Sequence, residues 1–363
     1  MRRLINSITA FLEDSGFECS RQVIGGNSFI CTRTLDGVHE RTILPLEIAA
    51  TSESEACRIS DEVSECLMNL EGYPLIITED RWHAQPEMTR ARLLAHLEVH
   101  DQAFARNCVV RRIEKAEARD FLIRNHSYGD AACKYRYGLF LMRQTGHLAG
   151  RFPIESGMTT AAGTAGSGMT MAMGKNGAAT AECGHGMLVA VATFSNARKW
   201  LKGGREIRSY EWTRYASLPG LRVSGGMGKM LKAFINEVHP DDIMSYADLE
   251  WSEGTVYGKL GFTLEGRKDP VLFSVDPGSW RRSPVKPGMT AVPARDVIAR
   301  DVVAEDVIAG DVVAEDVIAR DVVAEDVIAR DVVAEDVIAG STGNLYFRNF
   351  GSNKYRLKLT DYE

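Results

Sequence analysis

The sequence predicts a mixed α/β (α+β) fold, with a mixed central sheet, a smaller N-terminal α/β domain and two low-complexity insertions. The clearest indication is the stretch 208–262, in which strands and helices alternate. A strand over 210–218 leads into a glycine-rich turn at 222–228, and an amphipathic helix and a strand over 243–249 follow. The chain of 363 residues, 45% apolar and 25% charged, is long enough for two domains. The predicted division is 1–103, then 104–280 with an insertion at 150–186, then 281–340, and finally 341–363, whose strands complete the second domain.

The N-terminal domain is predicted to contain three helices and several short strands. A helix is predicted over residues 1–17, because its apolar residues lie on one face and Gly16 is a helix-ending residue. Strands follow over 17–23, 28–33 and 41–49, then a helix over 54–71 and a buried strand over 73–78. A helix over 86–97 carries Arg90, Arg92 and His96, which either face DNA phosphates or form a solvated face.

The second domain begins near Phe104. A strand over 108–113 and a helix over 115–124 end at Asn125-His126. Alternating apolar residues over 135–142 and 187–195 predict two strands that pair as a hairpin. Closing strands are predicted over 270–275 and within 344–359.

Two stretches lack the pattern of a packed core. Residues 150–186 are mostly Gly, Ala, Thr, Ser and Met, and this composition predicts a flexible insertion in the hairpin turn. From Asp296 to Gly340, nine acidic pentads alternate Asp-Val-Val-Ala-Glu with Asp-Val-Ile-Ala-Arg or Asp-Val-Ile-Ala-Gly. We predict a mobile acidic insert there, with a short coil or helix as the alternative, because β-branched residues disfavour an isolated helix.

The net charge of −6 is unevenly distributed. Residues 296–340 carry −10, so the remaining 318 residues sum to +4 and are mildly basic. This balance permits a nucleic-acid partner without requiring one.

Composition also predicts the compartment. The N-terminus lacks a signal-peptide core, and no run of eighteen apolar residues occurs, so we expect a cytoplasmic protein without a membrane partner. Seven cysteines, never closer than nine residues, fit reduced thiols rather than a zinc knuckle. The oligomeric state is not predicted.

The glycine-rich turn is the first candidate binding site. It reads Arg222-Val-Ser-Gly-Gly-Met-Gly228 and opens directly into the amphipathic helix. A helix N-terminus offers unpaired N–H groups and a positive dipole end, and glycines let an anion approach the backbone. A turn of this kind holds a pyrophosphate, or else it is a plain turn.

This region resembles the GCN5-related N-acetyltransferase (GNAT) family, in the order strand, glycine turn, helix, strand, and then a tyrosine before Gly-Phe. The family pattern is Arg/Gln-x-x-Gly-x-Gly/Ala. Arg222 and Gly225 match it, Met227 stands where a small residue is usual, and Gly228 comes one position late. The motifs that resemble the phage Mom branch, whose members modify DNA adenine, are Asn125-His126, Tyr137-Gly-Leu139, Ala192-Thr-Phe194, Gly225-Gly226, Ser245-Tyr-Ala-Asp248 and Tyr257-x-x-Leu-Gly-Phe262.

The resemblance implies acetyl-CoA or another acyl-CoA as cofactor and DNA as a possible partner. It assigns the cofactor to the turn and its flanks, namely Leu218, Arg222, Val223, Ser224, Gly225, Gly226, Met227, Gly228 and Lys229. It also implies that the backbone N–H groups near 216–218 polarise the thioester carbonyl, as in an oxyanion hole.

The same resemblance suggests proton-transfer roles. Tyr257 would protonate the departing thiolate, or it is a core aromatic residue. Glu211 or Asp248 would accept the amine proton, although Glu211 could instead pair with Arg214. Ser245 is regarded as functional in the Mom branch.

Two further residues each have two interpretations. His126 lies in a loop that admits the acceptor, or it caps a helix. Trp251 stacks on a flipped base or packs in the core.

The N-terminal domain resembles restriction-endonuclease-like nucleases in its element order, with Asp36 before one strand and Glu47 within it. The lysine expected two residues later is Ala49, so we expect this domain to be a degenerate nuclease at most.

The predicted function is therefore an acyl-CoA dependent N-acyltransferase that modifies a nucleobase amine in DNA. The alternatives are a catalytically inactive nucleic-acid binding protein, and a GNAT enzyme that acts on a protein or a small amine.

Overall fold

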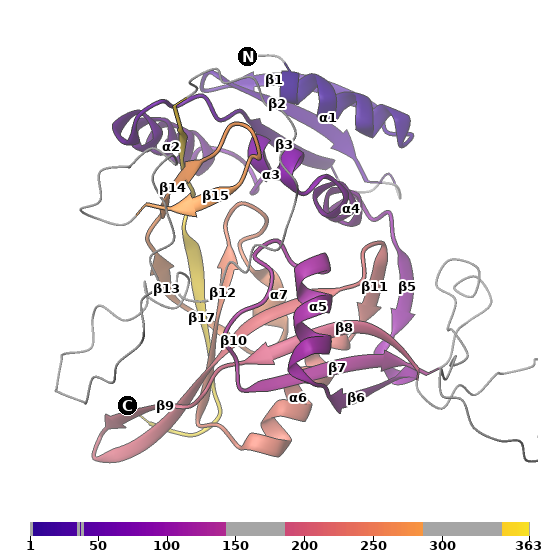
Figure 1. Cartoon of the computed structure of the whole chain (residues 1–363), viewed down its shortest axis with the longest axis vertical. Helices are drawn as coiled ribbons and strands as arrows, with labels where there is room; N and C mark the ends of the chain where they lie inside the picture. Colours follow the sequence, from indigo (N-terminus) through magenta and orange to yellow (C-terminus); the bar gives the residue numbers. More distant parts are fainter. Residues whose placement is uncertain (1–2, 35–36, 38–39, 143–185, 286–342, 363) are drawn as a thin grey trace, which may run out of the picture. The chain divides into compact units, whose positions relative to one another are not determined.

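The computed structural model describes residues 3–34, 37, 40–142, 186–285 and 343–362 (Figure 1). The chain forms two compact units. Unit 1 comprises residues 1–98 and 244–357, and unit 2 comprises residues 99–243 and 358–363. This grouping places 244–280 with the N-terminal residues, whereas the sequence-based division places that stretch with 104–243. The predicted insertions 150–186 and 281–340 lie outside the described residues, apart from Gly186 and residues 281–285. Arg282–Pro284 form a strand of unit 1, so the predicted start of the second insertion at residue 281 is wrong.

Unit 1 contains a four-stranded sheet whose strands follow the chain in the order β1-β2-β3-β4. The pairs β1–β2 and β2–β3 are antiparallel, and β3–β4 is parallel. The elements of this N-terminal part are α1 (Arg3–Asp14), β1 (Cys19–Ile24), β2 (Asn27–Arg33), β3 (Glu40–Leu46), α2 (Glu53–Met68), β4 (Leu75–Thr78), α3 (Glu79–Ala84) and α4 (Pro86–His96). Each helix and strand predicted for residues 1–97 is present, and α3 is an additional helix that was not predicted.

The second segment of unit 1 adds short strands. They form a β15-β14-β16 sheet and a β13–β17 antiparallel pair. The elements are α7 (Thr255–Lys259), β13 (Thr263–Lys268), β14 (Leu272–Val275), β15 (Arg282–Pro284), β16 (Leu345–Arg348) and β17 (Ser352–Lys358). Phe273, Val275, Phe347 and Phe350 share one apolar core with Phe29 and Leu44 of the N-terminal sheet.

Unit 2 is built around the strands β10-β8-β7-β6, with β9 paired to β10. The β7–β8 pair is antiparallel, so the predicted hairpin is confirmed. A separate parallel pair joins β11 to β5. The elements are β5 (Asp101–Phe104), a 3-10 turn at Ala105–Asn107, β6 (Cys108–Arg112), α5 (Lys115–Asn125), β7 (Tyr135–Leu141), β8 (Met187–Phe194), β9 (Arg198–Lys202), β10 (Arg205–Ser217), β11 (Leu221–Ser224) and α6 (Gly226–Val238).

Helices α5 and α6 cover opposite faces of these strands, as the period-two alternation of β8 requires. Val191 packs with Phe121 and Leu122 of α5. Phe194, three residues further along, stacks on Phe234 of α6, with ring centroids 3.9 Å apart. The boundary between the units falls within β12 (Asp242–Asp248), after Ile243.

The mixed α/β class is confirmed, since parallel and antiparallel pairs and helices occur together. The sequence-based prediction missed β5, β9, β11, β13 and β15, and it began β10 five residues late.

Candidate functional site

The predicted glycine turn is shorter than the sequence suggested. Arg222, Val223 and Ser224 belong to β11, which pairs in parallel with β5 through Val223 and Ala103, among others. Leu221 and Val223 are buried and alternate with exposed Arg222, which is a strand pattern. The turn itself is Gly225, with φ +78° in the left-handed region, and α6 begins at Gly226.

Gly226 allows the first turn of α6 to lie close to the strands. A Cβ atom at this position would lie 3.1 Å from Leu139 Cδ2 and 3.2 Å from Val223 Cβ, so a larger residue would require these neighbours to shift. The first amides of a helix have no acceptor within the helix, and its dipole is positive at this end. The backbone at Gly226, Met227 and Gly228 is therefore chemically suited to an anion.

The side chains around the turn serve the fold. Lys229 Nζ donates to the carbonyl oxygens of Ala105 at 2.8 Å and Cys108 at 2.5 Å, which ties α6 to the start of β6. Ser224 Oγ accepts a hydrogen bond from Gln102 Nε2 at 3.0 Å. Because the Lys229 ammonium already binds two carbonyl oxygens, the backbone N–H groups at the start of α6 are the better candidates for phosphate contacts.

The predicted oxyanion role of Leu218 meets a specific obstacle. Its N–H donates to the Val189 carbonyl at 2.9 Å, within the unit 2 sheet. This amide would have to leave that partner before it could polarise a thioester carbonyl.

In unit 1, the structure brings two predicted residues together. Ser245 on β12 and Tyr257 on α7 share a hydrogen bond of 2.8 Å between their hydroxyl groups. The Tyr257 hydroxyl also lies 3.3 Å from the Tyr246 carbonyl oxygen. The Tyr257 ring stacks on Tyr355, with centroids 5.1 Å apart, and Ser245 is buried. Tyr257 therefore has both a packing role and a polar partner.

Asp248 ends the same strand, and its surroundings are ionic. Its Oδ1 accepts the Glu250 N–H at 3.0 Å, and its Oδ2 lies 3.7 Å from Arg81 Nη2. Burial raises the pKa of Asp248, and the negative charge of Glu250 raises it further, while Arg81 opposes both. A carboxylate with a raised pKa is a better proton acceptor near neutral pH than an ordinary one.

The neighbouring carboxylate belongs to a buried network that the sequence did not reveal. Glu250 is fully buried and accepts from Arg282 Nη1 at 2.7 Å and from Arg81 Nε at 2.8 Å. Arg282 also pairs with Asp80 and donates to Thr78 Oγ1 at 2.7 Å. Burial opposes ionisation of Glu250, but Arg282 and Arg81 outweigh it and hold its pKa at about 2. The one hint in the sequence was the charged run Glu79-Asp80-Arg81 directly after the apolar strand β4.

The other two candidates for proton transfer lie in unit 2. Glu211 is half-buried on β10, and it opposes the lowering of the Arg214 pKa that burial causes, so the two side chains interact electrostatically. His126 caps α5 through its N–H, which donates to Leu122 O at 2.8 Å, and its Nδ1 accepts the Tyr128 N–H at 3.1 Å. The cap uses the backbone of His126, so proton transfer by its side chain would have to use Nε2.

The basic residues of α4 form two separate stacks on tryptophan rings of unit 1, one on Trp251 and one on Trp82. Trp251 is 2% exposed, stacks on His96 and lies under the Arg92 guanidinium at 4.3 Å. Arg90 lies over Trp82 at 5.1 Å. Burial, together with Arg92 and Arg41, lowers the pKa of His96 to about 4, so its ring is neutral. The core interpretation of Trp251 holds, and Arg92 and His96 pack on its ring, whereas Arg90 is exposed.

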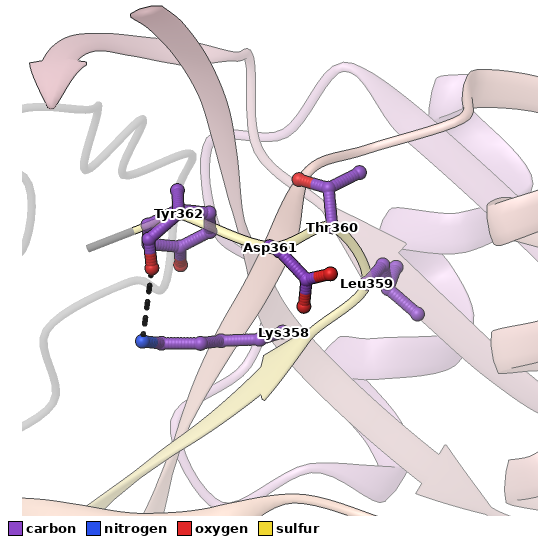
Figure 2. Close-up of a pocket in the computed structure, with 5 residues that line it drawn as sticks. All are labelled: Lys358, Leu359, Thr360, Asp361 and Tyr362. Atoms are coloured by element: carbon purple, nitrogen blue, oxygen red, sulfur yellow. Dashed lines mark hydrogen bonds between the residues drawn. The ribbon is translucent and has the colours of Figure 1, made fainter. Parts of the chain in front are cut away.

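Within the described residues, no group of three or more His, Cys, Asp or Glu side chains could hold a metal ion. No helix in this part of the chain is long and apolar enough to cross a membrane. A hollow of about 430 Å³ is lined by five consecutive residues, Lys358–Tyr362, and so is formed by one stretch of backbone (Figure 2). It lacks the convergent walls of a cofactor site.

The site residues therefore fall into two groups. Unit 2 holds the helix start at Gly225–Gly226, Glu211 and His126, and unit 1 holds Ser245, Asp248 and Tyr257. Comparison with protein-family models and with curated proteins finds no match for the chain.

Proposed function

We propose that the protein is an acyl-CoA dependent N-acyltransferase of the GNAT type that modifies a nucleobase amine in DNA. The observation that carries the proposal is the start of α6, where a left-handed Gly225 and a closely packed Gly226 join the short strand β11 to a helix of thirteen residues. A helix start of this kind, which presents unpaired backbone N–H groups behind glycines, suits the diphosphate of a cofactor.

The chain's own residues supply proton transfer. When bound, an acyl-CoA would supply an activated thioester; the amine nitrogen bonds to its carbonyl carbon as the carbon–sulfur bond breaks. Asp248 is the preferred acceptor of the amine proton because its pKa is raised. The Tyr257 hydroxyl, held by Ser245 at 2.8 Å, is the donor to the departing sulfur.

DNA is proposed as the acceptor on two grounds. The motifs that resemble the Mom branch include Ser245, Asp248 and Tyr257, and the chain outside the acidic repeat is mildly basic. An exocyclic amine is protected within the duplex, so such an enzyme has to extract the base before transfer.

Two measurements on the full chain test the proposal. We expect acetyl-CoA or another acyl-CoA thioester to raise the thermal unfolding midpoint, since a ligand that binds only the folded state stabilises it. We also expect a modified nucleoside in DNA from an expressing host, detected by mass spectrometry. No midpoint shift at saturating thioester would favour nucleic-acid binding without catalysis. A shift without a modified nucleoside would point to a protein or small-molecule amine.

Tyr257→Phe tests the proposed proton donor. It keeps the ring that stacks on Tyr355 but removes the hydroxyl, so product formation should fall about 100-fold or more while the thioester midpoint shift persists. The matched control is Tyr355→Phe, which removes the hydroxyl that donates to the Glu253 carbonyl at 2.5 Å. Equal activity of the two variants would refute the role of Tyr257.

A further inference from the structure

Strand β9 and the first residues of β10 form a β-hairpin arm over Arg198–Ser209, which has no role in the proposed acyl transfer. Arg205 pairs with Lys202 across the arm, and Ser209 pairs with Arg198. Among the described strands, β9 pairs only with β10. Figure 1 shows the arm extending away from β8, β7 and β6.

The arm is strongly basic. It carries five cations, Arg198, Lys199, Lys202, Arg205 and Arg208, and one carboxylate, Glu206. Lys199 pairs with Glu206 at 3.0 Å, and Asp241 beside the arm accepts from Arg205 at 3.0 Å and lies 3.7 Å from Arg208 Nε. With Asp241 and with Asp242, which accepts from Ser209 Oγ, both included, the formal balance of the arm is still two positive charges. A phosphate chain complements such a surface.

These cations lie on both faces of the ribbon. Side chains of paired residues point to the same face, and successive residues alternate. Arg198, Lys202 and Arg205 therefore share one face, and Lys199 and Arg208 share the other. Ile207 and Ser209 on the first face are buried, so the exposed part of the ribbon is residues 199–206.

The two exposed apolar side chains also divide between the faces. Trp200 is 42% exposed and Leu201 is 78% exposed, and as neighbours in one strand they point in opposite directions. A peripheral membrane element requires its apolar residues on one side, so this arm does not match a bilayer surface. A two-stranded ribbon with cations on both faces matches the major groove of B-DNA, which admits such a ribbon between two phosphate backbones.

The C-terminal residues of unit 2 brace the arm. The Lys202 ammonium lies 5.1 Å from the centre of the Tyr362 ring, and the Lys358 ammonium lies 4.8 Å from the same ring. Figure 2 shows Lys358 with its amine directed at the Tyr362 carbonyl oxygen, 3.5 Å away. The brace holds Lys202 against the Tyr362 ring and adds no net charge, because it contains both Lys358 and Asp361.

We propose that the β9–β10 arm docks this protein on double-stranded DNA by entering the major groove, with its cations on the phosphates of both strands. This inference deepens the proposed function, on which it rests for the choice of DNA as partner. It does not require that any acyl group be transferred.

The test uses the full chain with the double substitution Lys199→Gln and Lys202→Gln, which removes one cation from each face. The matched control is Lys115→Gln with Lys232→Gln, which removes two exposed lysines from α5 and α6. Binding to a fluorescent duplex of about 20 base pairs is measured by anisotropy over a range of salt concentrations. We expect the arm variant to bind about tenfold more weakly at roughly 0.15 M salt, and its log–log salt slope to be shallower by about 2. The control variant should behave like the parent.

Three outcomes would overturn the inference. The parent protein does not bind duplex DNA at low salt, or the arm variant binds the duplex as tightly as the parent does. The third is that, in a parallel assay with vesicles of anionic phospholipid, the arm variant loses affinity for the vesicles and not for the duplex. Coenzyme A thioester binding, followed by thermal shift, reports separately on the proposed function. Arm-dependent DNA binding without any thioester shift would therefore refute the transferase and leave the arm's role standing.

Discussion

Glu250 lies at the centre of the buried charge network in unit 1, and its ionisation links this residue to stability. Its carboxylate accepts from Arg282 at 2.7 Å and from Arg81 at 2.8 Å, and the side chain has no exposed surface. Two buried guanidinium groups favour the charged form, so the pKa falls from 4.5 to about 2. A carboxylate whose pKa is lower in the folded state adds stability above its unfolded pKa and loses that contribution as pH falls.

We therefore predict that Glu250→Gln destabilises the protein by roughly 3 kcal/mol at neutral pH, because it leaves both arginines with one buried carboxylate fewer. The difference in the free energy of unfolding between the variant and the parent should decrease as pH falls from about 4.5 to about 2, because the Glu250 carboxylate of the parent becomes protonated over this range. Denaturant unfolding at several pH values measures this.

The matched control for Glu250 is Glu265. Its pKa is also about 2, because Arg356 at 2.7 Å and Lys354 at 2.9 Å outweigh its partial burial, but its side chain is 35% exposed. Solvent screens such a pair, so Glu265→Gln should cost about 1 kcal/mol or less. If the two variants lose the same stability, the buried network is not the cause.

At the scale of the element, the start of α6 depends on a backbone conformation that glycine adopts without strain. Gly225 has φ +78°, and the nearest atom to a Cβ there would be Ala105 Cβ at 3.5 Å, an ordinary contact. A substitution at Gly225 is therefore destabilising because of backbone strain at positive φ, and not because of a steric clash.

We predict that Gly225→Ala destabilises the folded chain by about 1 kcal/mol and weakens the midpoint shift given by an acyl-CoA thioester, because the helix start moves to relieve strain. Gly225→Asn should retain more of both, since Asn tolerates the left-handed region better than Ala. Thermal unfolding with and without thioester compares the variants. An alanine variant as stable as the asparagine variant would contradict this account.

Regular periodicity explains which elements could be predicted. The helix at Arg3–Asp14 and the β7–β8 hairpin repeat their apolar residues over several turns or pairs, so sequence was sufficient. The strands β5 and β11 have four residues each, too few to show a period, and they exist because they pair with each other. The glycine-rich stretch 222–228 was therefore predicted as a turn, although residues 221–224 form a strand.

The candidate site was predictable only where it follows a local motif. Ser245 and Tyr257 are twelve residues apart, and each lies in a motif that resembles the Mom branch. Arg81 and Glu250 are 169 residues apart, and Arg282 and Asp80 are 202 apart, so only the fold brings them together. No local pattern predicts such a network.

At the scale of the whole molecule, the last residues of the chain are part of unit 2, although β17 before them belongs almost wholly to unit 1. The Leu359 N–H donates to the Asp241 carbonyl at 2.9 Å, and Thr360 Oγ1 donates to the Asp241 carboxylate at 3.1 Å. The Tyr362 hydroxyl donates to Asp242. The tail thus satisfies acceptors that precede β12 or begin it.

Ending the chain after Lys358 leaves β17 whole and removes these three donors. Because Asp241 and Asp242 are buried, we predict that this truncation lowers the free energy of unfolding of unit 2 by about 3 kcal/mol. Hydrogen exchange should become faster in β10, whose Arg208 N–H also donates to Asp241 at 2.8 Å, while protection in β2 and β3 of unit 1 is kept. Tyr362→Phe, which removes only one donor, should give about a third of the effect. Equal acceleration throughout both units would show instead that they unfold as one cooperative body, and the tail would then stabilise the whole chain.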